Sequence, residues 1–323
     1  MFYIENNFLL QNVKNQTKHL LYTMEITILG TSCMVPTKER NVQGIYVEYN
    51  GEGILIDCGE GTQRQMNIAG LNRNKIRKIL ITHWHGDHVS GLIGLLQTIS
   101  NNENPQKVTL FGPKETKERI FHLLKAVGFE HNRLELDIKE LNPKGVEKIF
   151  QNKDYYIECA YMDHKMPCLG YSIVDKDKRK INIVKANKLG LKQGPQIGKL
   201  QKGQSITIKG KTIKPEDVSH MQQGKKLTII LDTLPCINAY ELAKDADLLI
   251  AEAAYLAELE EKGLEYKHLT TKDAGLIATK ANVKKLIITH FSQRYKTAKE
   301  IEEEIKTFFK NSKAAYDFMK VKL

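Results

Sequence analysis

The stretch "ITHWHGDHVSG" runs from Ile81 to Gly91 and places three histidines and one aspartate within six residues. A strand-like apolar run, "IRKILITH", leads into it, and a helix-like run, "VSGLIGLLQTI", follows it. Imidazole nitrogen and carboxylate oxygen are ligands that zinc binds readily. Because a tight turn through Gly86 can splay these side chains toward different positions, the stretch predicts a metal site rather than a polar loop rich in histidine.

Four such ligands in one short loop are too crowded for one small ion, so we predict two metal ions that share the loop. Two metals need about seven protein ligands, and the missing three should also terminate strands. His164 follows "CAYMD", Asp232 follows "LTIIL" and His290 follows "LIIT". The predicted metal ligands are therefore His83, His85, Asp87, His88, His164, Asp232 and His290.

Short β-branched runs alternate with helix-like segments along most of the chain. The runs "EITILG", "GIYVEY" and "GILIDCG" are typical of successive strands, and "KERIFHLLKAVG" of an amphipathic helix closed by glycine. Strands that end in polar ligands, with helices outside, predict an α/β sandwich whose site lies along the strand ends.

The charge of this 323-residue chain is uneven. The net charge is +11, and the stretch from Asp175 to Lys226 holds fourteen Lys and Arg against four Asp and Glu. Within it, residues from about Ala186 to Gly210 are rich in Gly and Lys and carry few core-sized side chains. We therefore expect a flexible, protruding basic arm that contacts nucleic acid, with a merely solvated lysine-rich surface as the alternative.

The first 23 residues lack clear periodicity, and the first strand-like run starts at its own methionine, Met24. We expect 1–23 to be an extension, disordered or upstream of the true start, and 24–323 to be one domain that carries the arm. No signal peptide or membrane-spanning run is expected. Five dispersed cysteines without a C-x-x-C pair favour a reducing, cytoplasmic location.

The H-x-H-x-D-H pattern from His83 to His88 resembles the signature of the metallo-β-lactamase superfamily. That resemblance implies a four-layer αββα sandwich with a dinuclear zinc site, and a supporting role for Asp57 in "IDCGEGTQ". Further motifs resemble those of the ribonuclease Z family, in the right order from Met24 to the C-terminus: P-x-K-x-R-N at Pro36–Asn41, "GEGTQRQ", "DHKMPCLGY", "KHLTT" and "THFSQRY". Two motifs depart from the family: its G-D-T is "LDT" here, with Leu231, and its H-E-A-T is "AEAA" at Ala251–Ala254.

The resemblance implies a zinc-dependent endoribonuclease that removes the 3′ trailer of precursor tRNA and leaves a 3′-hydroxyl. It also implies two Zn²⁺ per chain, the first bound by His83, His85, His164 and Asp232, the second by Asp87, His88, Asp232 and His290. Asp87 would hold the attacking water, and His268, oriented by Glu252, would protonate the leaving oxygen. A structural imidazole and a structural carboxylate are the alternatives for these last two. A homodimer is implied by resemblance alone.

Three groups of residues are expected to contact the tRNA. Ser292, Arg294 and Tyr295 follow a predicted ligand directly and could reach a phosphate near the scissile bond, with an arginine ion-paired within the fold as the alternative. Lys38, Arg40 and Asn41 would contact the acceptor end. The arm, which lies where the short-form enzymes carry an exosite, would neutralise phosphates through Lys192, Lys199 and Lys202.

Two other functions remain open. A hydrolase of small esters, of the glyoxalase II or arylsulfatase type, could share the fold and the metal ligands, but it needs neither the basic arm nor the Pro36–Asn41 element. An RNA-binding protein with an inactive site is disfavoured because all seven predicted ligands are present.

Overall fold

The computed structural model describes residues 24–105, 107–129, 134–192, 194–208 and 210–323; the expected extension 1–23 lies outside them. The chain forms two compact units. Unit 1 comprises the chain up to Glu140 together with Ala315–Leu323, and unit 2 comprises Leu141–Ala314. Within the described ranges, no helix is long and apolar enough to cross a membrane.

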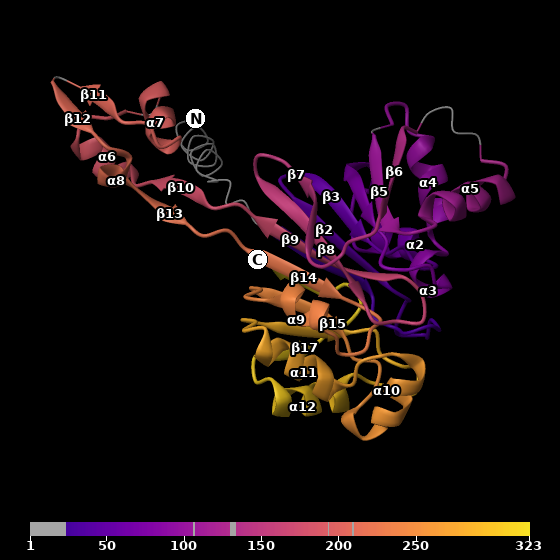
Figure 1. Cartoon of the computed structure of the whole chain (residues 1–323). Coiled ribbons are helices and arrows are strands. Elements are labelled where there is room, and N and C mark those ends of the chain that lie inside the picture. The colour runs from indigo at the N-terminus through magenta and orange to yellow at the C-terminus, as the bar shows by residue number, and fades with distance from the viewer. Residues whose placement is uncertain (1–23, 106, 130–133, 193, 209) are drawn as a thin grey trace, which may run out of the picture. The chain divides into compact units, whose positions relative to one another are not determined.

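Unit 1 is built on a seven-stranded sheet in the order β18-β1-β2-β3-β4-β5-β6 (Figure 1). Its strands are β1 (Met24–Gly30), β2 (Gly44–Tyr49), β3 (Glu52–Ile56), β4 (Ile76–Leu80), β5 (Val108–Pro113), β6 (Leu136–Leu141) and β18 (Lys320–Lys322). Strands β1 to β3 pair antiparallel, whereas β3, β4 and β5 are parallel neighbours. The carboxyl ends of β3 and β4 therefore meet at one edge, where the quoted histidine stretch begins.

The helices of unit 1 pack against one face of this sheet. They are α2 (Thr62–Ile68), the 3₁₀ turn η1 (Arg73–Lys75), α3 (Gly86–Val89), α4 (Leu92–Ser100) and α5 (Thr116–Ala126). Leu92, Leu95 and Leu96 of α4 are fully buried in one cluster with Leu55 of β3 and Ile79 of β4. The spacing of leucines along α4 explains this, because residues three and four apart share one side of a helix.

Unit 2 is built on a second seven-stranded sheet in the order β17-β16-β15-β14-β9-β8-β7. Its strands are β7 (Glu147–Gln151), β8 (Tyr155–Met162), β9 (Cys168–Asp175), β14 (Lys226–Ile230), β15 (Leu248–Glu252), β16 (Leu286–Thr289) and β17 (Ser312–Ala314). Strands β14, β15, β16 and β17 run parallel. Their residues are almost wholly buried, as is usual when a parallel sheet is covered.

Helices cover one face of this sheet as well. They are α9 (Ile237–Ala243), the 3₁₀ turn η2 (Ala257–Leu259), α10 (Glu260–Tyr266), α11 (Thr271–Lys280) and α12 (Lys299–Phe308). Ile277 of α11 and Ile301 of α12 join the same buried cluster as Leu249 and Ile288 of the sheet. Each unit thus has one helix layer and one sheet layer, as the predicted α/β class requires.

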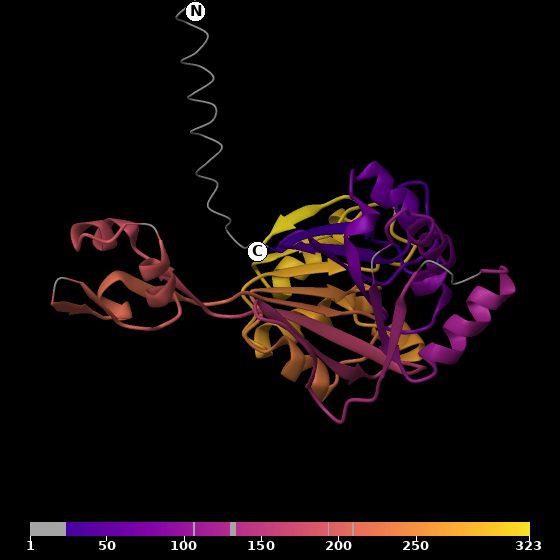
Figure 2. The same cartoon turned by 90° about the horizontal axis from the view of Figure 1, so that it is seen from above.

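The basic arm is longer than expected and has a core of its own. It leaves unit 2 on a ribbon of β10 (Lys178–Ile181) and β13 (Ser219–Gln222), and beyond the ribbon lie its remaining elements (Figure 2). These are α6 (Ile183–Lys188), α7 (Pro195–Gln201), β11 (Ile206–Ile208), β12 (Lys211–Ile213) and α8 (Pro215–Val218). Their buried side chains form a separate cluster: Ala186, Leu191, Leu200, Ile206, Ile213 and Val218.

Candidate metal centre

The histidine stretch in unit 1 is organised by Asp57, which follows β3 directly. The fully buried Asp57 carboxylate accepts the backbone N–H of Thr82 on Oδ1 at 2.8 Å and the Thr82 hydroxyl on Oδ2 at 2.7 Å. Oδ2 also lies 2.7 Å from Nδ1 of His88. The carboxylate therefore fixes the end of β4 and orients one predicted ligand, as expected for a residue that supports a metal loop.

The other predicted ligands of unit 1 gather beside this anchor. Nε2 of His83 lies 2.9 Å from Nδ1 of His85, so two nitrogens with metal-binding lone pairs converge. Nδ1 of His83 lies 3.1 Å from the Thr82 hydroxyl. Asp87 Oδ2 is 3.5 Å from Nε2 of His88 and accepts the backbone N–H of Met34 at 2.8 Å.

In unit 2 the predicted ligands come together at the carboxyl ends of neighbouring strands. Asp232 follows β14, Glu252 ends β15 and His290 follows β16, and these three strands are parallel neighbours. Nε2 of His290 lies 3.4 Å from Oδ1 of Asp232. His164, which follows β8, brings Nε2 to 3.9 Å from Oδ2 of the same aspartate.

His268 completes this cluster from the loop between α10 and α11. Its Nδ1 lies 3.8 Å from Oδ2 of Asp232, and ligand atoms of Asp232, His268 and His290 all lie within 4.8 Å of one another. Nδ1 of His268 is also 2.9 Å from Oε2 of Glu252. The predicted pairing of His268 with Glu252 is thus present in the structure.

The buried Glu252 carboxylate is held in its ionised form. Burial by itself would raise the pKa of Glu252, but the adjacent His268 and His290 outweigh burial and hold that pKa well below its usual range. The backbone N–H of Thr233 also donates to Oε1 of Glu252 at 2.7 Å. For His164 the balance is opposite: burial lowers its pKa despite the nearby Asp232, which favours the neutral imidazole that binds metal.

The donor set fits divalent zinc. Each unit presents imidazole nitrogens and carboxylate oxygens. Three of the predicted histidine ligands also have a second contact that orients the ring: Nδ1 of His83 with the Thr82 hydroxyl, Nδ1 of His88 with Asp57, and Nδ1 of His164 with the Lys267 carbonyl at 3.0 Å. No cysteine lies among these groups.

The residues expected to contact tRNA differ in exposure. Lys38, Arg294 and the arm lysines Lys192, Lys199 and Lys202 are exposed. Arg40 is only 8% exposed, and the Asn41 amide donates to the carbonyls of Glu60 and Val42. Both therefore also support the loop that carries them.

The residues that follow His290 contact the segment after β15, and these contacts were not predicted from the sequence. The Arg294 guanidinium lies over the ring of Tyr255 at 5.3 Å, and Ser292 Oγ is 3.3 Å from Arg294 Nε. Tyr295 is 6% exposed, and its hydroxyl accepts the backbone N–H of Leu256 at 2.9 Å. Tyr255 directly follows the altered "AEAA" motif, and no sequence pattern indicates its contact with Arg294.

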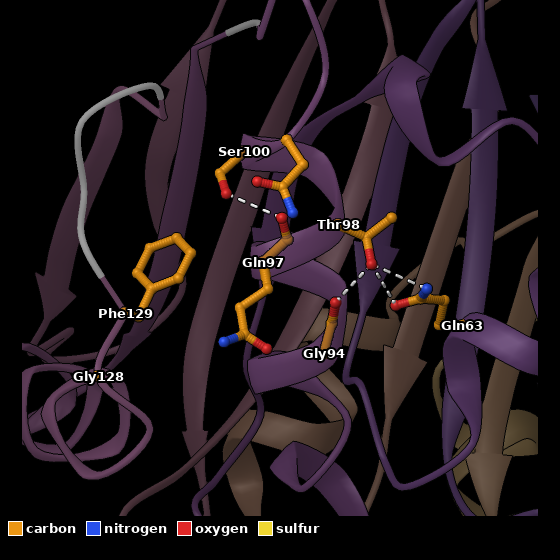
Figure 3. Close-up of a pocket in the computed structure, with 8 residues that line it drawn as sticks. Gln63, Gly94, Gln97, Thr98, Ser100, Gly128 and Phe129 are labelled. Atoms are coloured by element: carbon orange, nitrogen blue, oxygen red, sulfur yellow. Dashed lines mark hydrogen bonds between the residues drawn. The ribbon is translucent and has the colours of Figure 1, made fainter.

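A pocket of about 650 Å³ in unit 1 offers no competing centre (Figure 3). Its lining contains no ionisable side chain and consists of Gln63, Gly94, Gln97, Thr98, Ser100, Asn101, Gly128 and Phe129. Figure 3 shows the Gln63 amide bonded to the Thr98 hydroxyl, at 2.9 Å. This pocket lacks the acid–base and metal chemistry of the histidine clusters.

Two α/β units whose strand ends carry histidines and carboxylates define a hydrolase of the metallo-β-lactamase fold. Solved structures with this architecture include the Bacillus subtilis metallo-β-lactamase fold protein YhfI, with a TM-score of 0.67 and 16% identity over 94% of this chain and all of that one. The short form of human tRNase Z matches with a TM-score of 0.66 and 26% identity over 92% of this chain and 98% of that one. The fold class expected from the sequence is confirmed.

Relatives with similar sequences identify the family within this fold. A ribonuclease Z of Archaeoglobus fulgidus is 39% identical over 93% of this chain and 97% of its own length. A ribonuclease Z of Bacillus cereus is 38% identical over 91% of this chain and 97% of its own length. A family model described as anti-Pycsar protein Apyc1 also matches residues 24–183, less than half of the chain. The chain belongs to the ribonuclease Z family.

Proposed function

We propose that this protein is a tRNA 3′-processing endoribonuclease that hydrolyses the phosphodiester bond before the 3′ trailer and leaves a 3′-hydroxyl on the tRNA. The observation that carries the proposal is the gathering of histidine and carboxylate side chains at or just after strand ends, in groups that could hold metal ions, in a chain of this family. The names of the relatives and of the human structural neighbour support the same substrate.

The proposed cofactor is two Zn²⁺ per chain. His83, His85, His164 and Asp232 would hold one ion, and Asp87, His88, Asp232 and His290 the other. Bound zinc would lower the pKa of a coordinated water to about 7 and offset negative charge that develops on the phosphate. The convergence of His83 and His85 and the grouping of Asp232 with His290 support these assignments.

Side chains of the protein would then carry out two proton transfers, one from the attacking water and one to the leaving oxygen. The carboxylate of Asp87, fixed by the Met34 N–H, would orient the attacking water and accept its proton. His268 would donate a proton to the leaving 3′ oxygen. Glu252, which lies beside Nδ1 of His268, would orient the ring and leave Nε2 to face the substrate.

Substrate selection would depend on basic groups outside these clusters. Between Lys178 and Gln222 the arm holds eleven Lys and Arg against two acidic residues, which suits a polyanion and serves no purpose for a small ester. Arg294, Ser292 and Tyr295 would lie near the scissile phosphate, and Lys38, Arg40 and Asn41 near the acceptor end. A cytoplasmic location and a homodimer complete the proposal, supported by the dispersed thiols and by family resemblance respectively.

One assay tests the central claim. End-labelled precursor tRNA with a 3′ trailer is incubated with the zinc-loaded protein, and both product ends are mapped. The expected result is one cut that leaves a 3′-hydroxyl on the tRNA, abolished in Asp87→Ala while precursor binding persists. Turnover of a thioester or aryl sulfate without cleavage of the precursor would favour the small-ester alternative.

A further inference from the structure

Met34 has three features that are unusual in combination for a residue in a loop. Its backbone has a left-handed conformation with φ of 62°. Its side chain is 76% exposed. Its N–H donates to Oδ2 of Asp87 at 2.8 Å, so it lies directly beside a residue of the proposed site.

The surrounding loop holds Met34 in this conformation. The N–H groups of Thr31 and Ser32 both donate to the Asn41 carbonyl at 2.9 Å, which closes the loop at its base. Inside it, the Ser32 hydroxyl donates to the Val35 carbonyl at 2.6 Å, and the Val35 N–H donates to the Cys33 carbonyl at 2.7 Å. The left-handed backbone of Met34 is therefore imposed by its neighbours.

Neither the backbone conformation nor the exposure of this position favours a methionine. The left-handed region is strained for a residue with a Cβ, whereas glycine adopts it freely. The hydrogen bond to Asp87 uses only the backbone N–H, so glycine would make it equally well. Because most of the side chain lies in solvent, it adds little to a core and exposes apolar surface to water. Neither the hydrogen bond nor packing explains why a methionine is present.

We propose that the Met34 thioether is a nucleobase contact, which packs against the base of an unpaired nucleotide that flanks the scissile phosphate. Methionine is flexible and polarisable and makes favourable contacts with aromatic rings. Unpaired bases present aromatic faces, and proteins that read single-stranded RNA use such faces. Asp87 acts at the scissile phosphate under the proposed function, on which this inference rests, so the nearest base is that of an adjoining nucleotide.

The test combines two variants with altered substrates. Met34→Ala and Met34→Gly are assayed as zinc-loaded full-length protein on precursor tRNA that carries either the normal base or an abasic site on each side of the cleavage position. Both variants should raise KM about tenfold on the normal substrate, within the range for a lost base contact. The penalty should fall below twofold when the contacted base is absent.

Thermal stability distinguishes the effect of losing the Met34 side chain from the effect of relieving its backbone strain. Met34→Gly should have a higher Tm than Met34→Ala, because only glycine relieves the left-handed strain while both lose the thioether. Asn50→Gly is the matched control: Asn50 is exposed, has a φ of 52° and lies in the turn between β2 and β3, at the end of β2 remote from Gly44. This control should leave KM unchanged on every substrate.

Three results would overturn the inference. Equal penalties on normal and abasic substrates would mean that Met34 acts only through Asp87. An unchanged KM in both variants would make the side chain a bystander, and a Met34→Ala protein as stable as Met34→Gly would remove the strain argument. Failure of the unaltered enzyme to cut any precursor would instead refute the proposed function, before the variants are compared.

Discussion

Nδ1 of His268 lies 2.9 Å from Oε2 of Glu252, and Oε1 of the same carboxylate accepts the Thr233 N–H at 2.7 Å. The Thr233 N–H, just after β14, therefore holds the Glu252 carboxylate in place, and the same carboxylate orients the His268 ring in the loop after α10. This contact occupies Nδ1 of His268, and it gives the proposed proton donor a supporting residue that can be tested separately.

If Glu252 acts through His268, the two should not contribute independently. His268→Ala should lower kcat on precursor tRNA by roughly 10²–10⁴-fold, as expected for a lost general acid. Glu252→Gln should lower it by roughly tenfold or more, yet add less than twofold in the His268→Ala background. Zinc content is measured in every variant, since Glu252 Oε2 is also 3.8 Å from Nδ1 of His290. Multiplicative losses would assign the two residues separate roles.

Asp57→Asn tests the support of the metal loop. Asp57 has a φ of 56°, which asparagine tolerates, so the backbone should persist. One carboxylate oxygen becomes an amide that cannot accept from the Thr82 hydroxyl or pair with His88. Zinc affinity, measured by competition with a chelator, should fall by roughly 10–100-fold. An unchanged affinity would limit Asp57 to a role in folding.

Asp247 provides a pH-dependent contribution to folding. Burial tends to raise its pKa, but hydrogen bonds from Lys284, Lys225 and the Lys226 N–H hold that pKa below its usual value. A depressed pKa means that the stabilisation is present above the pKa of the unfolded chain, near 3.9, and is lost as pH falls through the folded value. Asp247→Asn should therefore lower the free energy of unfolding by about 1 kcal/mol at pH 7 and by less near pH 3.

Urea unfolding at the two pH values measures this difference. The control is Glu303→Gln, which removes an exposed ion pair in which Glu303 and Lys299 are 69% and 81% exposed. That control should change stability little at either pH. An effect of Asp247→Asn that does not vary with pH would contradict the assigned ion pairing.

The arm can be removed at its base. Lys178 and Gln222 are register partners in the β10–β13 ribbon, so Lys178–Gln222 can be replaced by an Asn-Gly turn. The shortened protein should show a sharply raised KM for precursor tRNA and a flatter dependence on salt, because fewer phosphates are neutralised. The defect should be much smaller on bis(p-nitrophenyl) phosphate. Equal affinity for precursor tRNA with and without the arm would make it dispensable.

Most of the strands, and the places of the proposed ligands after them, could be predicted because they depend on local patterns. Apolar runs such as "LTIIL" and "LIIT" form buried strands, and the polar residue that follows each one lies at the strand end. Because β14 and β16 both flank β15 and run parallel to it, Asp232 and His290 lie close together at one edge of the sheet.

The features that sequence reasoning missed depend on contacts between distant residues. The arm was expected to carry few core-sized side chains, yet Leu191, Leu200 and Ile213 join one buried cluster. Short elements and the connections between them bring these residues together, although their spacing in the sequence is irregular. The loop that carries Arg40 is anchored when the Asn41 N–H donates to Asp317 at 2.7 Å, a partner near the other end of the chain. No local pattern reveals such a pairing.

The place where the arm is inserted has a consequence for how such enzymes diversify. Strands β9 and β14 are hydrogen-bonded neighbours, with Val174 opposite Lys226, although the whole arm lies between them in sequence. In topological terms the arm is an enlarged hairpin loop. Its length, charge or even its identity can change without shifting the register of the strands that deliver Asp232. If the arm selects the substrate as proposed, recognition can be replaced as one inserted segment while the positions of the proposed metal ligands stay the same.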